Sequence, residues 1–356
     1  MQIYSKDFLD LYLDEMSRQI PYGSRRSRRR WASQDFDKAN VVNSIEMSLN
    51  LAAASSTRGP TGAVWSDCPW TEFQNDPSKG MTFWDDFILT SSAIASNTGN
   101  MGGWSIYGST GAQVNDAGVE GGVVKIGSDG DDESAVILSN TSTFRFVTTS
   151  TLALNQKMWY ESRWARSSIT TDIADHFAGL MKPTLSSGLP AVAQPITTTD
   201  DTLMTAGDFF GFHSNSNTAT RGGPTEIAAA FVLTSGTINY PTNLTTLMAS
   251  SSNSVLTAGG YVKTGWVFDP NAPFTRITTA TARQTAGNIR KALLRFYING
   301  LTTPAFLTSD DIANATATQA FPTAFMAPVF AVGNTSAGAT NTLNIDWVRI
   351  AQKANS

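Results

Sequence analysis

Short apolar runs separated by turn residues recur from Met81 to the C-terminus, and they constrain the fold of this chain more than any other feature. The runs are rich in β-branched and aromatic residues and hardly show the 3.6-residue periodicity of amphipathic helices. Two of the clearest are 292–300, which reads ALLRFYING, and 341–352, which reads NTLNIDWVRIAQ. Apolar and polar side chains alternate in both, and Asn299-Gly300 supplies a turn that ends the first. The pattern predicts an all-β protein built as a two-sheet sandwich or jelly roll.

The expected strands are bounded by glycine, asparagine, aspartate and other turn residues. They lie at 82–87, 104–107, 121–126, 135–138, 144–147, 158–165, 177–181, 209–213, 227–233, 265–268, 293–298, 329–332 and 343–350. The glycine-rich stretch 97–103 is expected to be a turn. Because these strands follow one another without a long helical segment, residues 80–356 are predicted to form one jelly-roll sandwich domain.

The first 79 residues differ from this body and are predicted to form two further segments, 1–31 and 32–79. Ser5 can cap a helix that ends before Pro21. Apolar residues recur in it at helical spacing, so the helix either folds back on the body or docks on a neighbouring subunit or another protein. The residues expected to make this contact are Phe8, Leu11, Tyr12 and Met16. Residues 32–79 are rich in turn residues and are predicted to be a connector with one or two added strands.

An extended arginine-rich arm follows this helix. Residues 1–31 carry a net charge of +3 and the remaining chain carries −7, within a total of −4. Like charges repel, so the arm is expected to be extended unless an anionic partner neutralises it. Guanidinium groups bind phosphates and carboxylates alike, which leaves nucleic acid, an acidic protein surface and a solvated linker as open alternatives. The residues concerned are Arg25, Arg26, Arg28, Arg29, Arg30 and Trp31.

Composition narrows the function classes. Charged residues make up only 15% of the chain, and a neutral surface rich in serine, threonine and asparagine is commoner in virion, adhesin and extracellular proteins than in cytosolic enzymes. Cys68 is the single cysteine, which excludes an intrachain disulfide and predicts a half-buried structural thiol. We find no run of about 18 apolar residues that would predict a membrane span. The N-terminus also lacks the apolar core of a secretory signal peptide.

Five motifs follow one another between about Gly80 and Gln352. They are FWDDF at 83–87, GGVVKI at 121–126, WYESRW at 159–164, RFYING at 295–300 and LNIDWVRIA at 343–351. This order resembles the concanavalin A-like (laminin G-like, lectin/glucanase) jelly rolls found in virion proteins of tailed bacteriophages. The resemblance implies that the strand ending in ING and the closing strand pair within the sandwich. It further implies a structural virion protein of the capsid decoration type.

Catalytic constellations are not recognisable in the sequence. Members of this fold that hydrolyse glycans resemble one another in a Glu-x-Asp-x-x-Glu strand, and that spacing does not occur here. Glu161 is the only carboxylate on its strand and lies two residues from Arg163, so an ion pair or cross-strand contact is expected. His176 and His213 have no accompanying Gly-x-Ser-x-Gly elbow, and structural or surface roles are expected for both. The sequence therefore predicts that the protein is not an enzyme.

Two weaker patterns point to ligands. A cluster of acids between glycines either gathers around calcium or forms a solvated turn, and it consists of Asp129, Asp131, Asp132 and Glu133. Trp104 and Tyr107 would stack on sugar rings if exposed, or anchor the core if buried. Cofactors are not expected. Four polar or amphipathic residues of the closing strands are expected to face solvent or a neighbouring subunit, namely Arg295, Tyr297, Asp346 and Arg349.

These features favour a phage capsid decoration or cement protein that binds the shell through its N-terminal arm. Its expected partners are the major capsid protein and further copies of itself, a trimer being one form, on a capsid surface reached after synthesis in the host cytoplasm. One alternative is a glycan- or receptor-binding module of a tail fibre or appendage, with a host-surface glycan as partner. A second alternative is a jelly-roll coat protein whose arm binds nucleic acid. A glycanase ranks last, and a membrane partner is not expected.

Overall fold

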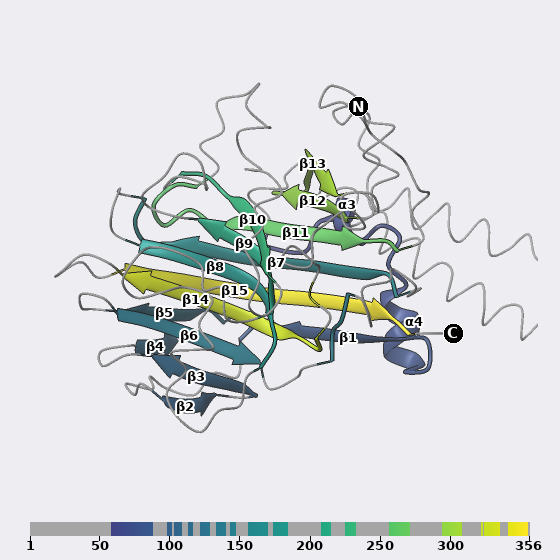
Figure 1. Cartoon of the computed structure of the whole chain (residues 1–356), viewed down its shortest axis with the longest axis horizontal. Helices are drawn as coiled ribbons and strands as arrows, with labels where there is room; N and C mark the ends of the chain where they lie inside the picture. The colour runs from purple at the N-terminus through teal and green to yellow at the C-terminus, as the bar shows by residue number, and fades with distance from the viewer. Residues whose placement is uncertain are drawn as a thin grey trace, which may run out of the picture. The chain divides into compact units, whose positions relative to one another are not determined.

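A computed structural model gives the structure of the chain (Figure 1). It describes residues 58–87, 98–101, 103–108, 113–116, 122–128, 133–139, 143–146, 156–169, 174–183, 208–214, 225–232, 256–270, 294–307, 322, 324–334 and 341–354. The predicted N-terminal helix, the arginine arm and the first part of the connector lie outside the described residues. The contact residues proposed there, Phe8 to Met16 and Arg25 to Trp31, therefore stay predictions, as do the domain boundaries.

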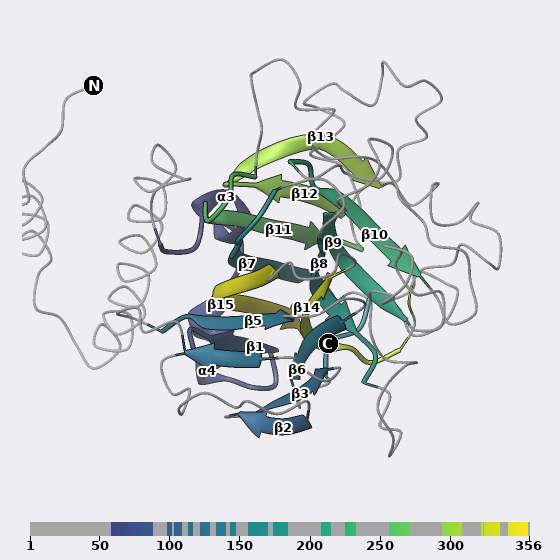
Figure 2. The same cartoon turned by 90° about the vertical axis from the view of Figure 1, so that its left-hand side faces the viewer.

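The described strands form two antiparallel sheets, which face each other as layers (Figure 2). Sheet A has the order β13-β12-β11-β7-β15-β5-β4, with β1 pairing β15 beyond β5, and sheet B has the order β10-β9-β8-β14-β6-β3-β2. Sheet A contains β1 (Gly80–Asp85), β4 (Gln113–Asp116), β5 (Val124–Ser128), β7 (Met158–Arg166), β11 (Val262–Phe268), β12 (Leu294–Ile298), β13 (Leu301–Leu307) and β15 (Asn341–Lys353). Sheet B contains β2 (Thr98–Met101), β3 (Trp104–Gly108), β6 (Glu133–Ser139), β8 (Ala174–Met181), β9 (Phe209–Ser214), β10 (Ala228–Val232) and β14 (Ala327–Asn334). The predicted all-β sandwich is confirmed.

The main core lies between the two sheets. Along β7, the side chains of Met158, Tyr160 and Trp164 point into it, because successive residues of a strand face opposite sides of a sheet. Tyr160 stacks on Trp266 of β11 with ring centroids 3.7 Å apart, and Phe210 of β9 meets the same indole from sheet B at 4.7 Å. The alternation read from the sequence thus assigns one face of β7 to the core. Its other face carries Trp159, Glu161 and Arg163.

The turn at Asn299-Gly300 is confirmed, because both residues have a positive φ, 50° and 77°, and connect β12 to β13. The implied pairing of the two closing strands is wrong. β12 and β15 belong to the same sheet A, but β11 and β7 lie between them, so the two strands are not hydrogen-bonded to each other. Edge strands β2, β4 and β13 were not expected, and β2 lies within the stretch predicted to be a turn. The run expected at 144–147 forms only an isolated bridge, between Phe144 and Met326.

The chain itself covers part of the outer face of sheet A. Residues 58–79 contain two short helices, α3 (Gly62–Trp65) and α4 (Trp70–Asn75), instead of the added strands expected for the connector. These helices lie on the side of sheet A that faces away from sheet B (Figure 2), and their contacts are with β7, β11 and β1. A second, smaller core forms beneath them from Val64, Trp65, Phe73, Trp159, Val267, Tyr297 and Ala351.

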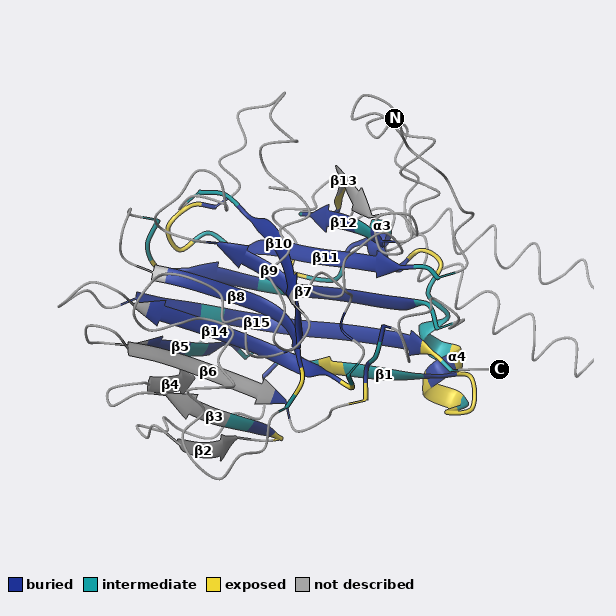
Figure 3. Ribbon diagram, viewed as in Figure 1, coloured by how far each residue is buried: buried dark blue, intermediate teal, exposed yellow. Residues whose placement is uncertain are grey.

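This cover corrects the expectation that the polar residues of the closing strands face solvent or another subunit. Tyr297 is 5% exposed, Asp346 1% and Arg349 8%, and only Arg295 is half-buried. Figure 3 shows β7, β11 and β15 buried along almost their whole length, whereas exposed residues gather on α4 and β1. The polar face of sheet A is therefore an internal interface between the sheet and residues 58–79.

Gly265 of β11 lies beneath α3, where the cover packs closely on the sheet. A Cβ atom at this position would lie 2.8 Å from the Tyr160 carbonyl oxygen and 3.2 Å from a methyl group of Val64 on α3. We expect Gly265→Ala to lower the free energy of unfolding by about 1–3 kcal/mol, measured by urea denaturation, because packed backbone cannot give way. Gly59→Ala is the matched control, since a Cβ there would meet nothing within 4 Å. Equal stability of the two variants would contradict the close approach.

Candidate functional site

Three buried charged side chains of sheet A, together with their partners, hold residues 58–79 on the sheet. The side chains used in these contacts are not available to bind a ligand. The first is Glu161 of β7, which is fully buried and accepts hydrogen bonds from the Thr61 backbone N–H at 3.0 Å, the Thr61 hydroxyl at 2.7 Å and the Trp65 indole N–H at 2.7 Å. Burial raises the pKa of Glu161 above its ordinary value, against the lowering effect of these hydrogen bonds. The expected ion pair with Arg163 is not formed.

The second of these side chains is Asp346 of β15, which joins two arginines. Arg58 donates from Nε to Asp346 Oδ1 at 2.6 Å, and Arg163 of β7 donates to Asp346 Oδ2. The Arg163 guanidinium also lies over the Tyr261 ring, 4.1 Å from its centroid. Trp347 donates its indole N–H to the Arg58 backbone oxygen, so both the side chain and the backbone of Arg58 are held. Arg163, which was expected to pair with Glu161, therefore forms its ion pair with Asp346.

The third of these side chains is Arg349 of β15, whose guanidinium lies among three tryptophan rings. Its central carbon is 4.4 Å from the Trp65 ring centroid, 3.8 Å from that of Trp70 and 4.9 Å from that of Trp84. Burial lowers the pKa of Arg349 to about 10, and cation–π contacts supply the stabilisation that water would otherwise give. Trp84, 48% exposed, is the outermost ring of this stack.

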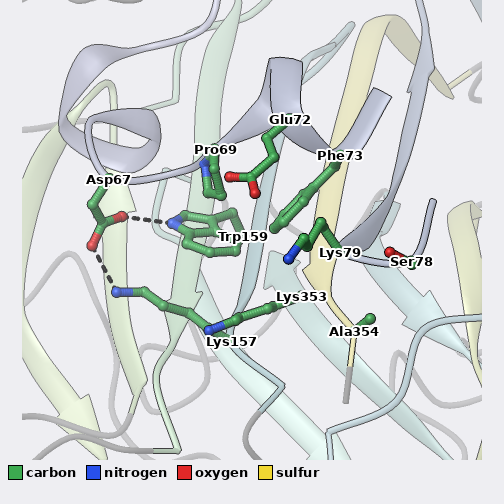
Figure 4. A pocket seen from close by; sticks show the side chains of 10 residues that line it. All are labelled: Asp67, Pro69, Glu72, Phe73, Ser78, Lys79, Lys157, Trp159, Lys353 and Ala354. Atoms are coloured by element: carbon green, nitrogen blue, oxygen red, sulfur yellow. Dashed lines mark hydrogen bonds and ion pairs between the residues drawn. The ribbon is translucent and has the colours of Figure 1, made fainter. Parts of the chain in front are cut away.

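A pocket of about 450 Å³ opens beside these side chains, between α4 and the adjoining ends of β7, β15 and β1. This volume falls within the range of about 300–1,000 Å³ typical of small-molecule sites. Figure 4 shows its aromatic side chains, Trp159 of β7 and Phe73 of α4, next to a ring of charged groups. The lining residues are Asp67, Pro69, Glu72, Phe73, Ser78, Lys79, Lys157, Trp159, Lys353 and Ala354.

One side of the pocket is a closed ion-pair network. Lys157 donates to Asp67 at 2.6 Å and to Asp269 at 2.9 Å, and Trp159 donates its indole N–H to Asp67 at 2.7 Å. Burial opposes ionisation of both partners, but the mutual hydrogen bonds prevail: they lower the pKa of Asp67 and raise the pKa of Lys157. Both groups are therefore charged at neutral pH and are already engaged with each other.

The other side of the pocket carries charged groups that are not engaged. Within the described part of the chain, the Glu72 carboxylate and the Lys79 and Lys353 ammonium groups make no ion pair or side-chain hydrogen bond. Glu72, Lys79 and Lys353 are exposed, and Figure 4 shows the three charged ends turned toward the space next to Trp159. An aromatic surface with an available acceptor and two available donors can hold a polar molecule that also has an apolar face.

The other sequence-predicted residues lie elsewhere. Trp104 is 1% exposed and donates to Asp85 at 2.6 Å, so its indole anchors the core and is not an exposed sugar platform. His176 and His213 are buried in sheet B, and the His213 Nε2 atom lies 3.9 Å from Asp175 Oδ2. Burial lowers the pKa of His176 well below its ordinary value. Cys68 is half-buried as expected, and burial raises the pKa of its thiol to about 12.

The metal prediction is not tested by the described side chains. Asp129, Asp131 and Asp132, and the side chains of Glu133 and Tyr107, lie outside them. Among the residues that are described, no group of three or more His, Cys, Asp or Glu side chains is arranged to hold a metal ion. None of the helices in the described ranges has the length and apolar character required to cross a membrane.

No protein-family model matches this chain, and no curated protein matches its sequence. Solved structures do resemble it. An endo-1,3-β-glucanase from Streptomyces sioyaensis is 13% identical, covers 78% of this chain and 98% of its own, and has a TM-score of 0.43. Basic winged bean lectin is 12% identical, with coverage of 77% and 99% and a TM-score of 0.42. Peanut lectin is 12% identical, with coverage of 77% and 97% and a TM-score of 0.39. The two antiparallel sheets show the predicted all-β sandwich, and the likeness of these solved structures to the chain concerns the fold alone.

The comparisons contradict the prediction that the chain is not an enzyme. Similar structures include the endo-1,3-β-glucanase, endo-acting O-glycanases of gut microbiota and a Bacteroides ovatus GH16 protein. The prediction rested on the missing Glu-x-Asp-x-x-Glu spacing and the missing nucleophile elbow, whereas the similar structures include both a glucanase and a lectin. The structures named here are not described as virion proteins, so the phage assignment is not supported by them.

Proposed function

We propose that this protein is a glycan-binding module and that its ligand occupies the pocket between α4 and the ends of β7, β15 and β1. The observation that carries the proposal is the composition of this pocket. Trp159 and Phe73 supply apolar surface, while Glu72, Lys79 and Lys353 supply polar groups without partners among the described residues. The pocket is held in shape by the Asp67–Lys157–Asp269 network, so little ordering is required when a ligand binds.

A saccharide fits this composition better than a purely apolar or purely ionic ligand. Sugar rings have faces of C–H groups that pack on aromatic side chains, and hydroxyl groups around the rim that need both donors and acceptors. Glu72 can accept hydroxyl protons, and the two lysines can donate to ring or hydroxyl oxygens. The glycan-binding alternative drawn from the sequence is also the one that agrees with the lectins among the similar structures.

The test is a glycan array followed by calorimetry with the best ligand, comparing the full chain with variants of the pocket. Ala354→Trp places a large ring in the cavity without removing any group that binds, and we expect at least a roughly tenfold loss of affinity. Glu72→Gln removes one charged acceptor and is expected to weaken binding roughly three- to tenfold. Thr143→Trp is the control for the added ring, since Thr143 is exposed and outside the pocket. Unchanged affinity in Ala354→Trp would rule out this pocket as the glycan site.

The setting in which such a module works stays a prediction from the sequence. A tail fibre or appendage would present it to a host-surface glycan, and the capsid-decoration role would place the same body on a shell. The residues on which the capsid role depends, in the N-terminal helix and the arginine arm, lie outside the described structure.

A further inference from the structure

Three lysines converge on the pocket from three neighbouring segments of sheet A. Lys157 precedes β7, Lys353 ends β15, and Lys79 precedes β1. Their backbones are tied together, because the Lys353 N–H donates to the Lys157 oxygen at 2.9 Å and the Ala354 N–H donates to the Lys79 oxygen at 2.8 Å. Adjacent strands of a sheet are about 4.8 Å apart, so long side chains from such positions reach a common point. The register of the strands thus brings three lysine side chains to the same pocket.

Some of the charged side chains of this pocket are paired with each other and others are not. Lys157 pairs with two carboxylates, those of Asp67 and Asp269, so this network carries one net negative charge. Two ammonium groups remain, on Lys79 and Lys353, and they face a single available carboxylate, on Glu72. The Asp76 carboxylate, which interacts electrostatically with Lys79, accepts hydrogen bonds from the Ser78 backbone N–H at 3.0 Å and from the Ser78 hydroxyl at 2.6 Å. The unpaired groups carry one excess positive charge, which the Lys157 network offsets. The place for an anion is therefore given by the two available ammonium groups and not by a net charge of the pocket.

Resting on the proposed function, we propose that the ligand is an anionic saccharide whose acidic substituent lies between Lys79 and Lys353. The ammonium groups bind the anion, the sugar ring packs beside Trp159 and Phe73, and Glu72 accepts hydroxyl protons. Lysine acts as a point charge and does not impose the paired geometry that an arginine would, so carboxylate and sulfate share this chemistry. The Glu72 carboxylate repels the anion, so the acidic substituent is expected next to the lysines and away from Glu72 itself.

The experiment compares two ligands of the same shape, trigalacturonate and its methyl ester, by calorimetry at low ionic strength. We expect the free acid to bind roughly tenfold more tightly than the ester, and its affinity to fall as salt is added. Lys79→Gln and Lys353→Gln should each reduce this preference several-fold, because the affinity for the acid falls more than the affinity for the ester, to which the glutamine amide can still donate. Lys182→Gln is the matched control, because Lys182 is exposed and lies beyond the end of β8 in sheet B. A sulfated trisaccharide, as a third ligand, separates carboxylate from sulfate recognition.

The outcomes distinguish this inference from the proposal on which it rests. Equal binding of acid and ester, with both lost in Ala354→Trp, would overturn the anionic preference and leave glycan binding intact. The acid could also still bind to Ala354→Trp but lose binding equally in all lysine variants, Lys182→Gln included. That result would indicate nonspecific charge attraction and would also overturn the anionic preference. Failure of every saccharide on the array and in calorimetry would remove the proposed function itself.

Discussion

Asp346→Ala is expected to lower the free energy of unfolding by about 3 kcal/mol. The carboxylate is 1% exposed and is shared by Arg58 and Arg163. Its removal leaves the Arg163 guanidinium, only 14% exposed, without an anion in a region that water barely reaches. Arg58 is 41% exposed and recovers part of its hydration, which places the expected loss at the lower end for a buried pair.

Urea denaturation at neutral pH measures this effect, and the comparison with two further variants assigns it. Arg58→Ala should cost less than Asp346→Ala, because the Asp346–Arg163 pair survives. Asp86→Ala is the carboxylate control, since Asp86 is half-buried and makes no ion pair in the described structure. A loss in Asp346→Ala no greater than that in Asp86→Ala would mean that the two arginines do not depend on Asp346.

The strands that could be predicted are those in the interior of the sheets. β7 and β15 each bury large alternating side chains against sheet B, and that alternation is legible without a structure. The strands that were missed, β2, β4 and β13, are all at sheet edges. β13 contains Pro304, which cannot donate a ladder hydrogen bond and therefore argues against a strand when read from sequence. At an edge one side of the backbone needs no partner, so a proline and weak patterning are tolerated there.

The covered face of sheet A shows a different limit of the sequence. Asp346 and Arg349 are polar, and polarity in an alternating strand ordinarily means solvent. The sequence pattern shows whether a side chain is polar, but it does not show which other part of the chain packs on that face of the sheet. Here the covering residues, such as Arg58, lie nearly 300 positions earlier in the sequence. The tryptophan-rich stretch 65–70 indicates this cover in the sequence, since large aromatic side chains in a turn-rich connector need a surface on which they are buried.

The pocket could not be predicted for the same reason. Its residues come from 67–79, 157–159 and 353–354, and only the pairing register of β1, β15 and β7 brings these segments together. Each lysine read alone is an ordinary surface lysine. Their convergence, and the engagement of Lys157 but not of Lys79 or Lys353, are properties of the folded chain that no local motif encodes.

Glu161→Gln is expected to change the pH dependence of stability rather than abolish folding. The pKa of Glu161 is raised by burial, so the folded protein holds this proton more firmly than the unfolded chain does. The stability that comes from this group is therefore fully present below its unfolded pKa, near 4.5, and is lost as pH rises through the higher folded value. Glutamine stays neutral throughout. The variant should thus gain stability relative to the native chain as pH increases, measured as the difference in unfolding free energy from pH 4 upward.

Glu161→Ala separates the hydrogen bonds of this side chain from its charge. It leaves the Thr61 backbone N–H and the Trp65 indole N–H without an acceptor under α3, and we expect a loss of about 3 kcal/mol near pH 4 that becomes smaller as pH rises and Glu161 ionises. Glutamine retains one oxygen for these two donors, and its amide can donate to the Thr61 hydroxyl, which reverses its direction. A parallel pH dependence in the native chain and Glu161→Gln would contradict the raised pKa, while equal stability of Glu161→Ala and the native chain near pH 4 would mean that Glu161 does not hold residues 58–79 on sheet A.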